Sequence, residues 1–274
     1  MIIAIDAEDR EKSKVKYELD TWAFALLGYL NQSRQDYAIR CIVQTSEQTD
    51  QRTLQKMKWF YFLTRRLAFL NQSRKMTLEI LSTKDSPRIE PYAIPTWRDV
   101  LVEGADWEPY KESELDEREP KEAHSAEDRE QCRIIGELEA NGLRAQKEFP
   151  ICFRRMAVSM SDDAAYRMDI VFRDDDTTLG IIELKVAKNK ELDAFAQCLD
   201  YFIYLSQIKG NLRNSGWLDY FRMERVDRIK CYLYCEEHHP AAKIVCNTYR
   251  RSKFDICYKK QNKAGLSVTY VDIC

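Results

Sequence analysis

The stretch that decides the fold reads Ala-Tyr-Arg-Met-Asp-Ile-Val-Phe over residues 165–172 and Ile-Ile-Glu-Leu-Lys-Val-Ala over residues 181–187. Both runs alternate apolar and polar side chains, which predicts two β-strands with one apolar face each. The polar segment between them ends in glycine, as is typical of a hairpin loop. If the two strands pair, Asp169, Glu183 and Lys185 meet on one face of a sheet.

Two carboxylates and one ammonium group in this arrangement suit metal-dependent phosphate chemistry. A hard cation such as Mg²⁺ or Mn²⁺ takes oxygen ligands, commonly one or two carboxylates with water and substrate phosphate. A bound cation lowers the pKa of its water, and an adjacent lysine orients or deprotonates that water or neutralises charge on the phosphate. The pattern predicts Asp169 and Glu183 as metal ligands and Lys185 as a catalytic group. A solvated strand face with paired charges is the alternative.

The order and spacing of these residues resemble a known family. Asp169 followed by Glu183-Leu184-Lys185 resembles the Asp…Glu-X-Lys signature of the PD-(D/E)XK nuclease superfamily. Gln197-Cys-Leu-Asp-Tyr201 is similar to the Gln-X-X-X-Tyr motif of its RecB-like branch, which includes lambda-type exonucleases. Met168 stands where the family usually has proline, a departure that the family tolerates. The resemblance covers roughly residues 125–204.

The resemblance implies an α/β (α+β) fold, with a restriction-endonuclease-like mixed sheet flanked by helices. It also implies that the carbonyl group of Leu184 helps Asp169 and Glu183 to hold Mg²⁺ or Mn²⁺. Gln197 and Tyr201 would lie at the edge of the active site. As plain chemistry, a glutamine and a tyrosine four residues apart also fit packing at the boundary of the core.

RecB-like nucleases carry a further acidic residue on the helix before the core strands. Such a helix is predicted to begin at Ser125, with acidic residues in its first turn and Asn141-Gly142 at its end. Glu130 is the residue expected to act as this catalytic acid and metal ligand. Glu127 and Glu137 are its rivals, and a surface glutamate is the alternative reading of all three.

Basic residues near the predicted site are expected to bind substrate. Lys188 and Lys190 follow the catalytic strand, where phosphate groups flanking the scissile bond would pass. Arg167 precedes Asp169 by two residues and is assigned to substrate binding with them. Ordinary loop lysines are the alternative for Lys188 and Lys190.

Composition excludes several classes of protein. The net charge of −2 gives no overall basic field for nucleic acid, so any such surface must be local. Nine cysteines without paired spacing fit a reducing interior better than a disulfide framework. Cys231 and Cys235 would lie about 13 Å apart on a strand, too far to share one zinc ion. With no signal-peptide pattern and no long apolar run, an intracellular protein is expected, cytoplasmic or, in a eukaryote, nuclear.

The chain is expected to have three parts. Residues 1–100 predict a smaller N-terminal α/β unit, and residues 125–274 the nuclease-like domain. Between them, residues 101–124 form an acidic linker, within a stretch from Glu103 to Glu130 that carries twelve acidic and four basic residues. An acidic strap that covers the nuclease groove as a nucleic-acid mimic is the alternative reading of this linker.

The N-terminal unit contains a short repeat. Leu27-Gly-Tyr-Leu-Asn-Gln-Ser-Arg34 recurs forty residues later as Leu67-Ala-Phe-Leu-Asn-Gln-Ser-Arg74, each time at a predicted helix end before a strand. Either the unit is duplicated or two helices end with the same capping chemistry. In a duplicated unit, Arg34 and Arg74 would form a pair able to bind phosphate or a partner's carboxylate.

The sequence therefore predicts a metal-dependent nuclease that hydrolyses phosphodiester bonds, with DNA favoured over RNA as its partner. The N-terminal unit would target or regulate the nuclease. The same unit is a candidate for forming a homodimer or for binding a partner protein. The alternative is a non-catalytic nucleic-acid-binding or sensor protein on a nuclease-like scaffold. The presence of Asp169, Glu183 and Lys185 together argues against a decayed site.

Overall fold

The computed structural model describes residues 2–6, 26, 29, 38–45, 54, 58–71, 75–82, 88–102, 109, 125–151, 167–185, 193–235, 254–255, 258–260 and 267–273. The chain divides into two compact units, Met1–Glu103 and Gly104–Cys274. Each unit contains one sheet with helices, so the predicted mixed α/β class is confirmed. Of the acidic linker expected at 101–124, only residues 101, 102 and 109 are described.

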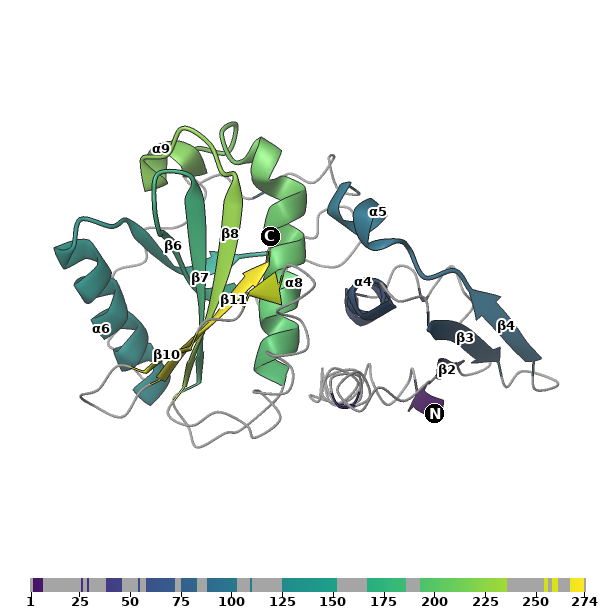
Figure 1. The fold of residues 1–274 in the computed structure, drawn as a ribbon. Coiled ribbons are helices and arrows are strands. Elements are labelled where there is room, and N and C mark those ends of the chain that lie inside the picture. The colour runs from purple at the N-terminus through teal and green to yellow at the C-terminus, as the bar shows by residue number, and fades with distance from the viewer. Residues whose placement is uncertain are drawn as a thin grey trace. The chain divides into compact units, whose positions relative to one another are not determined.

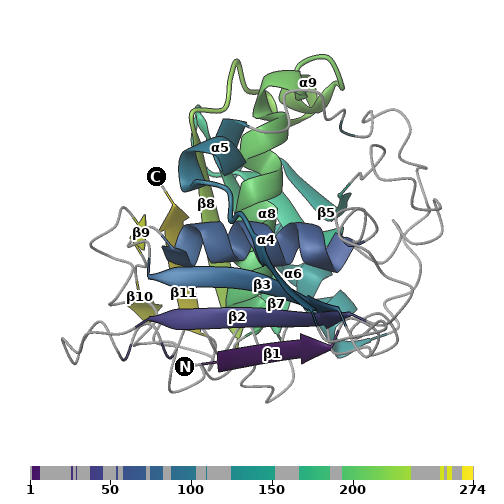
Figure 2. The same cartoon turned by 90° about the vertical axis from the view of Figure 1, so that its right-hand side faces the viewer.

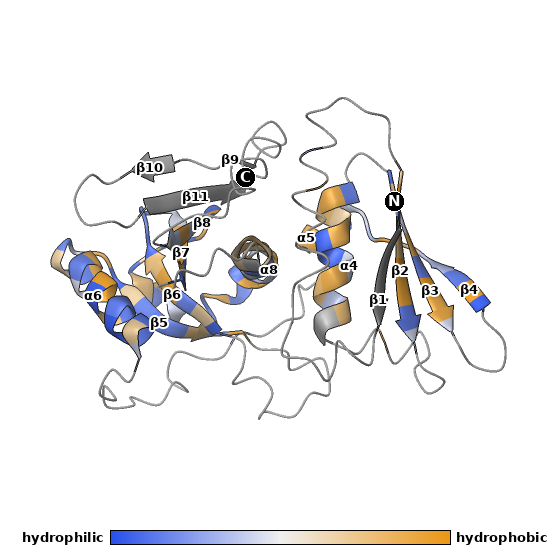
Figure 3. Ribbon diagram, turned by 90° about the horizontal axis from the view of Figure 1, so that it is seen from below, coloured by the Kyte–Doolittle hydropathy of each residue, from blue (hydrophilic) through white to orange (hydrophobic). Residues whose placement is uncertain are grey.

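The first unit is built on a four-stranded sheet in the order β1-β2-β3-β4. Its strands are β1 (Ile2–Asp6), β2 (Ile39–Thr45), β3 (Met76–Ser82) and β4 (Arg88–Tyr92). The first three are parallel, and β4 is antiparallel to β3. Helices α4 (Lys58–Leu70) and α5 (Trp97–Val102) lie on the same side of this sheet (Figure 3).

The core of the first unit lies between α4 and one face of this sheet. Side chains of β2 alternate between buried and partly exposed, as a strand covered on one face requires. Phe60 of α4 packs edge-on against Tyr92 of β4 with ring centroids 5.2 Å apart. On β2 and β3, Arg40 donates from its Nε to Glu79 at 2.8 Å. Figure 2 shows β1, β2 and β3 running side by side near α4.

The second copy of the sequence repeat connects a helix to a strand. Asn71 follows α4, and its side-chain oxygen accepts a hydrogen bond from the backbone N–H of Met76, the first residue of β3, at 2.8 Å. The asparagine of this copy therefore fixes the turn between the two elements. Asn31, Arg34 and Arg74 lie outside the described residues.

The second unit is built on a seven-stranded mixed sheet in the order β10-β11-β8-β7-β6-β5, with β9 paired to β11. Its strands are β5 (Ala145–Pro150), β6 (Arg167–Arg173), β7 (Thr178–Lys185), β8 (Arg228–Cys235), β9 (Phe254–Asp255), β10 (Tyr258–Lys260) and β11 (Ser267–Ile273). β7 and β8 are parallel, and the other described pairs are antiparallel.

Helices cover both faces of this sheet. α6 (Ala126–Ala140) and α8 (Asp193–Ile208) lie on opposite faces (Figure 1). The 3₁₀ turn Lys209–Asn211 and the short helix α9 (Trp217–Phe221) follow α8. No helix in the described parts of the chain is long and apolar enough to cross a membrane.

Capping chemistry sets the ends of α6. Ser125 is the N-cap residue, and its side chain accepts a hydrogen bond from the backbone N–H of Asp128 at 3.0 Å. Gly142 follows the helix with a φ of 77°, a conformation that glycine adopts without steric cost. Ile134 of α6 packs against a buried cluster that includes Ile170 of β6 and Leu184 of β7. The helix predicted from Ser125 is therefore present.

The predicted hairpin joins β6 and β7, with Phe172 paired to Gly180. The Phe172 ring covers Gly180 so closely that an added Cβ would lie 2.2 Å from a ring carbon. Phe172 also packs against Tyr232 of β8, with ring centroids 5.5 Å apart. Any larger residue at position 180 would therefore displace this ring.

Two segments differ from what the sequence predicts. Pro150 in an apolar run predicts a strand at 149–158 beside the Asp169 strand. In the structure β5 instead ends at Pro150, whose nitrogen has no hydrogen for a further ladder bond. Residues 152–166 lie outside the described residues. Pro87, Pro91 and Pro95 predict that the segment 87–95 ends the first unit. In the structure it contains β4, an edge strand, which tolerates Pro91, and the first unit continues to Glu103.

Candidate metal and catalytic site

The candidate site lies where the ladder between β6 and β7 stops. The last pair of this ladder is Ile170 with Ile182, which are the chain neighbours of Asp169 and Glu183. Beyond it, the Asp169 carboxylate accepts a hydrogen bond from the backbone N–H of Leu184 at 2.6 Å. β7 remains paired with β8 as far as Lys185. The carboxylate thus replaces a backbone acceptor and fixes Asp169 beside β7.

Glu183 is a buried carboxylate, with 1% of its surface exposed. Lys185 donates from its Nζ to Oε1 of Glu183 at 2.5 Å. Oε2 of Glu183 has no hydrogen-bond partner among the described residues. Because a buried, unpaired carboxylate oxygen is strongly unfavourable, this atom fits a cation ligand better than a structural group.

The pKa values of Asp169 and Lys185 are both raised, for different reasons. Burial raises the pKa of Asp169 well above its usual range, and the charge of Glu183 raises it further. Burial alone would lower the pKa of Lys185, but the carboxylate of Glu183 outweighs this and the pKa is raised. Lys185 therefore stays protonated near neutral pH. In this state it can neutralise negative charge but cannot accept a proton.

A cavity of about 300 Å³ adjoins Asp169. It lies at the beginning of α6 and along β5, and is lined by Ser125, Glu127, Asp128, Gln131, Glu148 and Asp169. Burial raises the pKa of Glu127; Lys185 opposes this, while Glu183 and Glu148 add to it. Of Glu130 and its two rivals in the sequence, Glu127 is therefore the one that lines the cavity with Asp169. Asp128 lines it too and forms an ion pair with Lys147.

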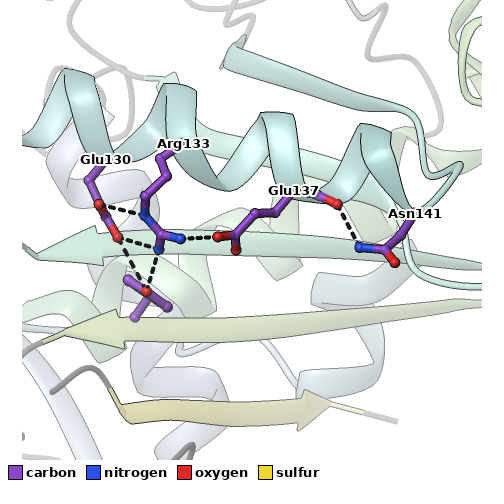
Figure 4. A network of polar contacts seen from close by, with 5 residues as sticks. Glu130, Arg133, Glu137 and Asn141 are labelled. Carbon is purple, nitrogen blue, oxygen red and sulfur yellow. Dashed lines mark hydrogen bonds and ion pairs between the residues drawn. The ribbon is translucent and has the colours of Figure 1, made fainter. Parts of the chain in front are cut away.

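Glu130 lies in a different network, drawn in Figure 4. Arg133 donates from Nε to Glu130 Oε2 at 2.9 Å, and the hydroxyl of Tyr234 donates to Oε1 at 3.2 Å. The hydrogen bond from Arg133 lowers the pKa of Glu130. Arg133 also forms an ion pair with Glu137, the other rival. Neither Glu130 nor Glu137 is among the residues that line the cavity.

The two motif residues of α8 have different environments. Tyr201 is buried, and its hydroxyl donates to the backbone carbonyl of Arg167 at 3.1 Å, two residues before Asp169. Gln197 is half-buried, and its side-chain oxygen has no hydrogen-bond partner among the described residues. The side chain of Arg167 is half-buried, and Lys188 and Lys190 lie outside the described residues.

Glu148 and Gln131 line the cavity but were not predicted from the sequence. Gln131 is buried and donates to Glu148 Oε1 at 3.3 Å. Neither residue belongs to a recognisable motif, and both positions read as ordinary polar residues of a helix and a strand. The one signal in the sequence was that Gln131 follows Glu127 by four residues, which places both on the same face of the helix.

The donor set suits a hard divalent cation. Carboxylate oxygens of Asp169, Glu183 and Glu127 and the carbonyl group of Leu184 are oxygen ligands of the kind that Mg²⁺ and Mn²⁺ bind. The described residues contain no group of three or more His, Cys, Asp or Glu side chains arranged as a ready metal cage. Mg²⁺ usually keeps several waters and uses only one or two carboxylates, so the pair Asp169 and Glu183 is sufficient. Comparisons of the chain with protein-family models, curated proteins and solved structures found no match.

Proposed function

We propose that this protein is a metal-dependent nuclease of the PD-(D/E)XK type that hydrolyses phosphodiester bonds of nucleic acid. The observation that carries the proposal is the buried oxygen of Glu183, which has no partner among the described residues, beside Asp169 and Lys185. The order α6-β5-β6-β7-α8-β8, with helices on both faces and β8 parallel to β7, supports a restriction-endonuclease-like fold. DNA is the favoured substrate because of the RecB-like resemblance.

In this proposal Asp169, Glu183 and the carbonyl group of Leu184 would hold Mg²⁺ or Mn²⁺, with Glu127 as the additional acid from α6. The cation, when bound, supplies Lewis acidity and an activated water. Lys185, protonated beside Glu183, stabilises the negative charge that develops on the phosphate in the transition state. Because the side-chain oxygen of Gln197 is unpartnered among the described residues, it is available to orient water or substrate.

Phosphate contacts would come from Arg167, Lys188 and Lys190 and would give affinity without sequence readout. The net charge of the chain is −2, so such contacts would be local. The affinity for nucleic acid should therefore fall with added salt in proportion to the number of these few phosphate contacts.

The test is cleavage of end-labelled linear and closed circular DNA, single- and double-stranded, with Mg²⁺ or Mn²⁺. Asp169→Asn, Glu183→Gln and Lys185→Met are compared with the wild type and with Glu137→Gln, a change at an exposed glutamate of α6. We expect the wild type and Glu137→Gln to cleave, and the three site variants to lose at least about 100-fold in rate. Cleavage of circles would identify an endonuclease.

Absence of cleavage by the wild type on DNA, and then on RNA, would overturn the proposal. It would favour the alternative, a binding or sensor protein on a nuclease-like scaffold. Equal activity in the wild type and all three site variants would show that a contaminating nuclease is responsible. Folding of each variant is checked by its urea unfolding curve.

A further inference from the structure

β5 contains a backbone irregularity beside Asp169. Its ladder with β6 pairs Lys147 with Ile170 and Phe149 with Met168, but omits the intervening pair of Glu148 with Asp169. Glu148 has a φ of 52°, in the left-handed region that residues with a side chain rarely adopt. Such a conformation in a glutamate needs a reason, and functional sites are where it is commonly found.

The irregularity changes the direction of one side chain. Lys147 contacts Asp128 of α6, and Glu148 contacts Gln131 of the same helix. Phe149 instead packs against Trp217 of α9, with ring centroids 4.4 Å apart. Two successive side chains of a regular strand point to opposite faces, so they could not both reach α6. The left-handed conformation thus turns Glu148 toward α6, as bulges near active sites do.

The redirected carboxylate reaches the cavity that Glu127 and Asp169 also line. Independent of this cluster, Glu183 is 1% exposed and has an oxygen without a partner among the described residues. The charge of Glu183 raises the pKa of both Glu127 and Asp169, two residues that line this cavity. Glu127 and Glu148 thus share a cavity with Asp169, and Glu183 has a buried oxygen without a partner among the described residues. A bound cation would balance the negative charge of these carboxylates.

We propose that Glu148 is a further carboxylate of the cation site, and that its left-handed backbone exists to bring it there. This inference rests on the proposed function, since it adds a residue to the same site. It assigns a role to a residue outside the sequence signature. Gln131, which donates to Glu148 Oε1, would hold the carboxylate in place.

The experiment measures Mn²⁺ binding to the full chain by titration calorimetry. Glu148→Gln, Glu148→Ala and Glu148→Gly are compared with the wild type and with Glu139→Gln, a change at an exposed glutamate of α6. We expect all three Glu148 variants to bind Mn²⁺ about 10- to 100-fold more weakly and Glu139→Gln to bind as the wild type does. Asp169→Asn reports separately on the cation site itself.

A second measurement tests the backbone. Urea unfolding in the presence of EDTA should give Glu148→Gly a higher midpoint than Glu148→Ala, because glycine adopts a positive φ without steric cost. The two variants lack the same carboxylate, so their difference isolates the conformation. A midpoint for Glu148→Gly at or below that of Glu148→Ala would overturn the claim that the backbone is strained.

The outcomes separate this inference from the function on which it rests. If Asp169→Asn abolishes Mn²⁺ binding but Glu148→Gln binds as the wild type does, the inference fails and the proposed site stands. If the wild type binds no Mn²⁺, the proposed cation site fails and the assignment of Glu148 fails with it.

Discussion

The Asp169 carboxylate and the backbone N–H of Leu184 form a 2.6 Å hydrogen bond across the point where β6 and β7 cease to pair. One oxygen of Asp169 therefore has a structural role, while the carboxylate lines the cavity. The arrangement links the folding of the hairpin to the position of a predicted metal ligand. It also makes the ionisation of Asp169 a determinant of stability.

The first prediction concerns Asp169→Asn in the absence of metal. Because the pKa of Asp169 is raised on folding, the native state binds its proton more tightly than the unfolded chain does. Its contribution to stability is complete below pH about 3.8 and is lost as pH rises through the raised pKa. Asparagine keeps an acceptor for Leu184 and removes this loss. We expect the variant to be more stable than the wild type near pH 7, by on the order of 1 kcal/mol.

Urea unfolding in EDTA at several pH values between 4 and 7 checks this. The difference between Asp169→Asn and the wild type should be small near pH 4 and grow as the pH rises. A variant that is less stable than the wild type at pH 7, or a difference that does not change with pH, would contradict the prediction.

The second prediction distinguishes the two glutamates of α6. Glu127→Gln should weaken Mn²⁺ binding by about tenfold, because Glu127 lines the cavity beside Asp169. Glu130→Gln should leave Mn²⁺ binding unchanged, and should cost up to about 1 kcal/mol of stability through its contact with Arg133. Titration calorimetry and urea unfolding measure the two effects. The opposite ranking of the variants would restore Glu130 as the site residue.

The third prediction concerns the hydroxyl of Tyr201. Tyr201→Phe removes its hydrogen bond to the carbonyl of Arg167 and should destabilise the protein by about 1 kcal/mol. Tyr220→Phe is the matched control, since that hydroxyl donates to the carbonyl of Ala145 at 2.8 Å. Only Tyr201→Phe should accelerate amide hydrogen exchange at Leu184, because it loosens β6 near Asp169. Equal exchange at Leu184 in both variants would refute this coupling.

The hairpin and the meeting of Asp169 with β7 were predictable from sequence because they depend on local alternation and a short loop. The helix-capping signals at Ser125 and Asn141-Gly142 were equally local. The role proposed for Glu148 was not predictable, because it depends on a positive φ in a segment, Lys-Glu-Phe-Pro, without the usual turn residues around the glutamate. The choice of Glu130 over Glu127 rested on the position of Glu130 one turn before Ile134 on the same face of the helix. It could not include Tyr234, which is 104 residues away in the chain.

The fourth prediction concerns the buried ion pair. Lys185→Met leaves the carboxylate of Glu183 buried without its cation and should destabilise the protein by roughly 3 kcal/mol. The double variant Glu183→Gln with Lys185→Met should lose less than Lys185→Met alone, because no charge is then buried. Urea unfolding at pH 7 in EDTA is measured for the wild type, the two single variants and the double variant, which together form a double-mutant cycle. Additive losses in the double variant would show that the two side chains do not interact.

The fifth prediction contrasts two glycines. Gly136 lies inside α6 with no atom near an added Cβ, so Gly136→Ala should stabilise the protein by about 0.5–1 kcal/mol. Gly180→Ala would place a methyl group against the Phe172 ring and should destabilise it by about 1–3 kcal/mol. Thermal unfolding measures both. A stabilising Gly180→Ala would show that the ring moves aside freely.

The close packing of Phe172 on Gly180 also decides which residues of β7 can face Asp169. If β7 slid along β6 by one residue, Leu179 or Ile181 would have to fit beneath the Phe172 ring, where only a hydrogen atom has room. The same slip would move Glu183 about 3.3 Å along the strand and turn it to the other face of the sheet. The position of Glu183 relative to Asp169 therefore depends on the packing of the Phe172 ring, which lies about 10 Å from Asp169 along β6. A substitution in the hairpin is therefore expected to alter the candidate site at the opposite end of β6 and β7.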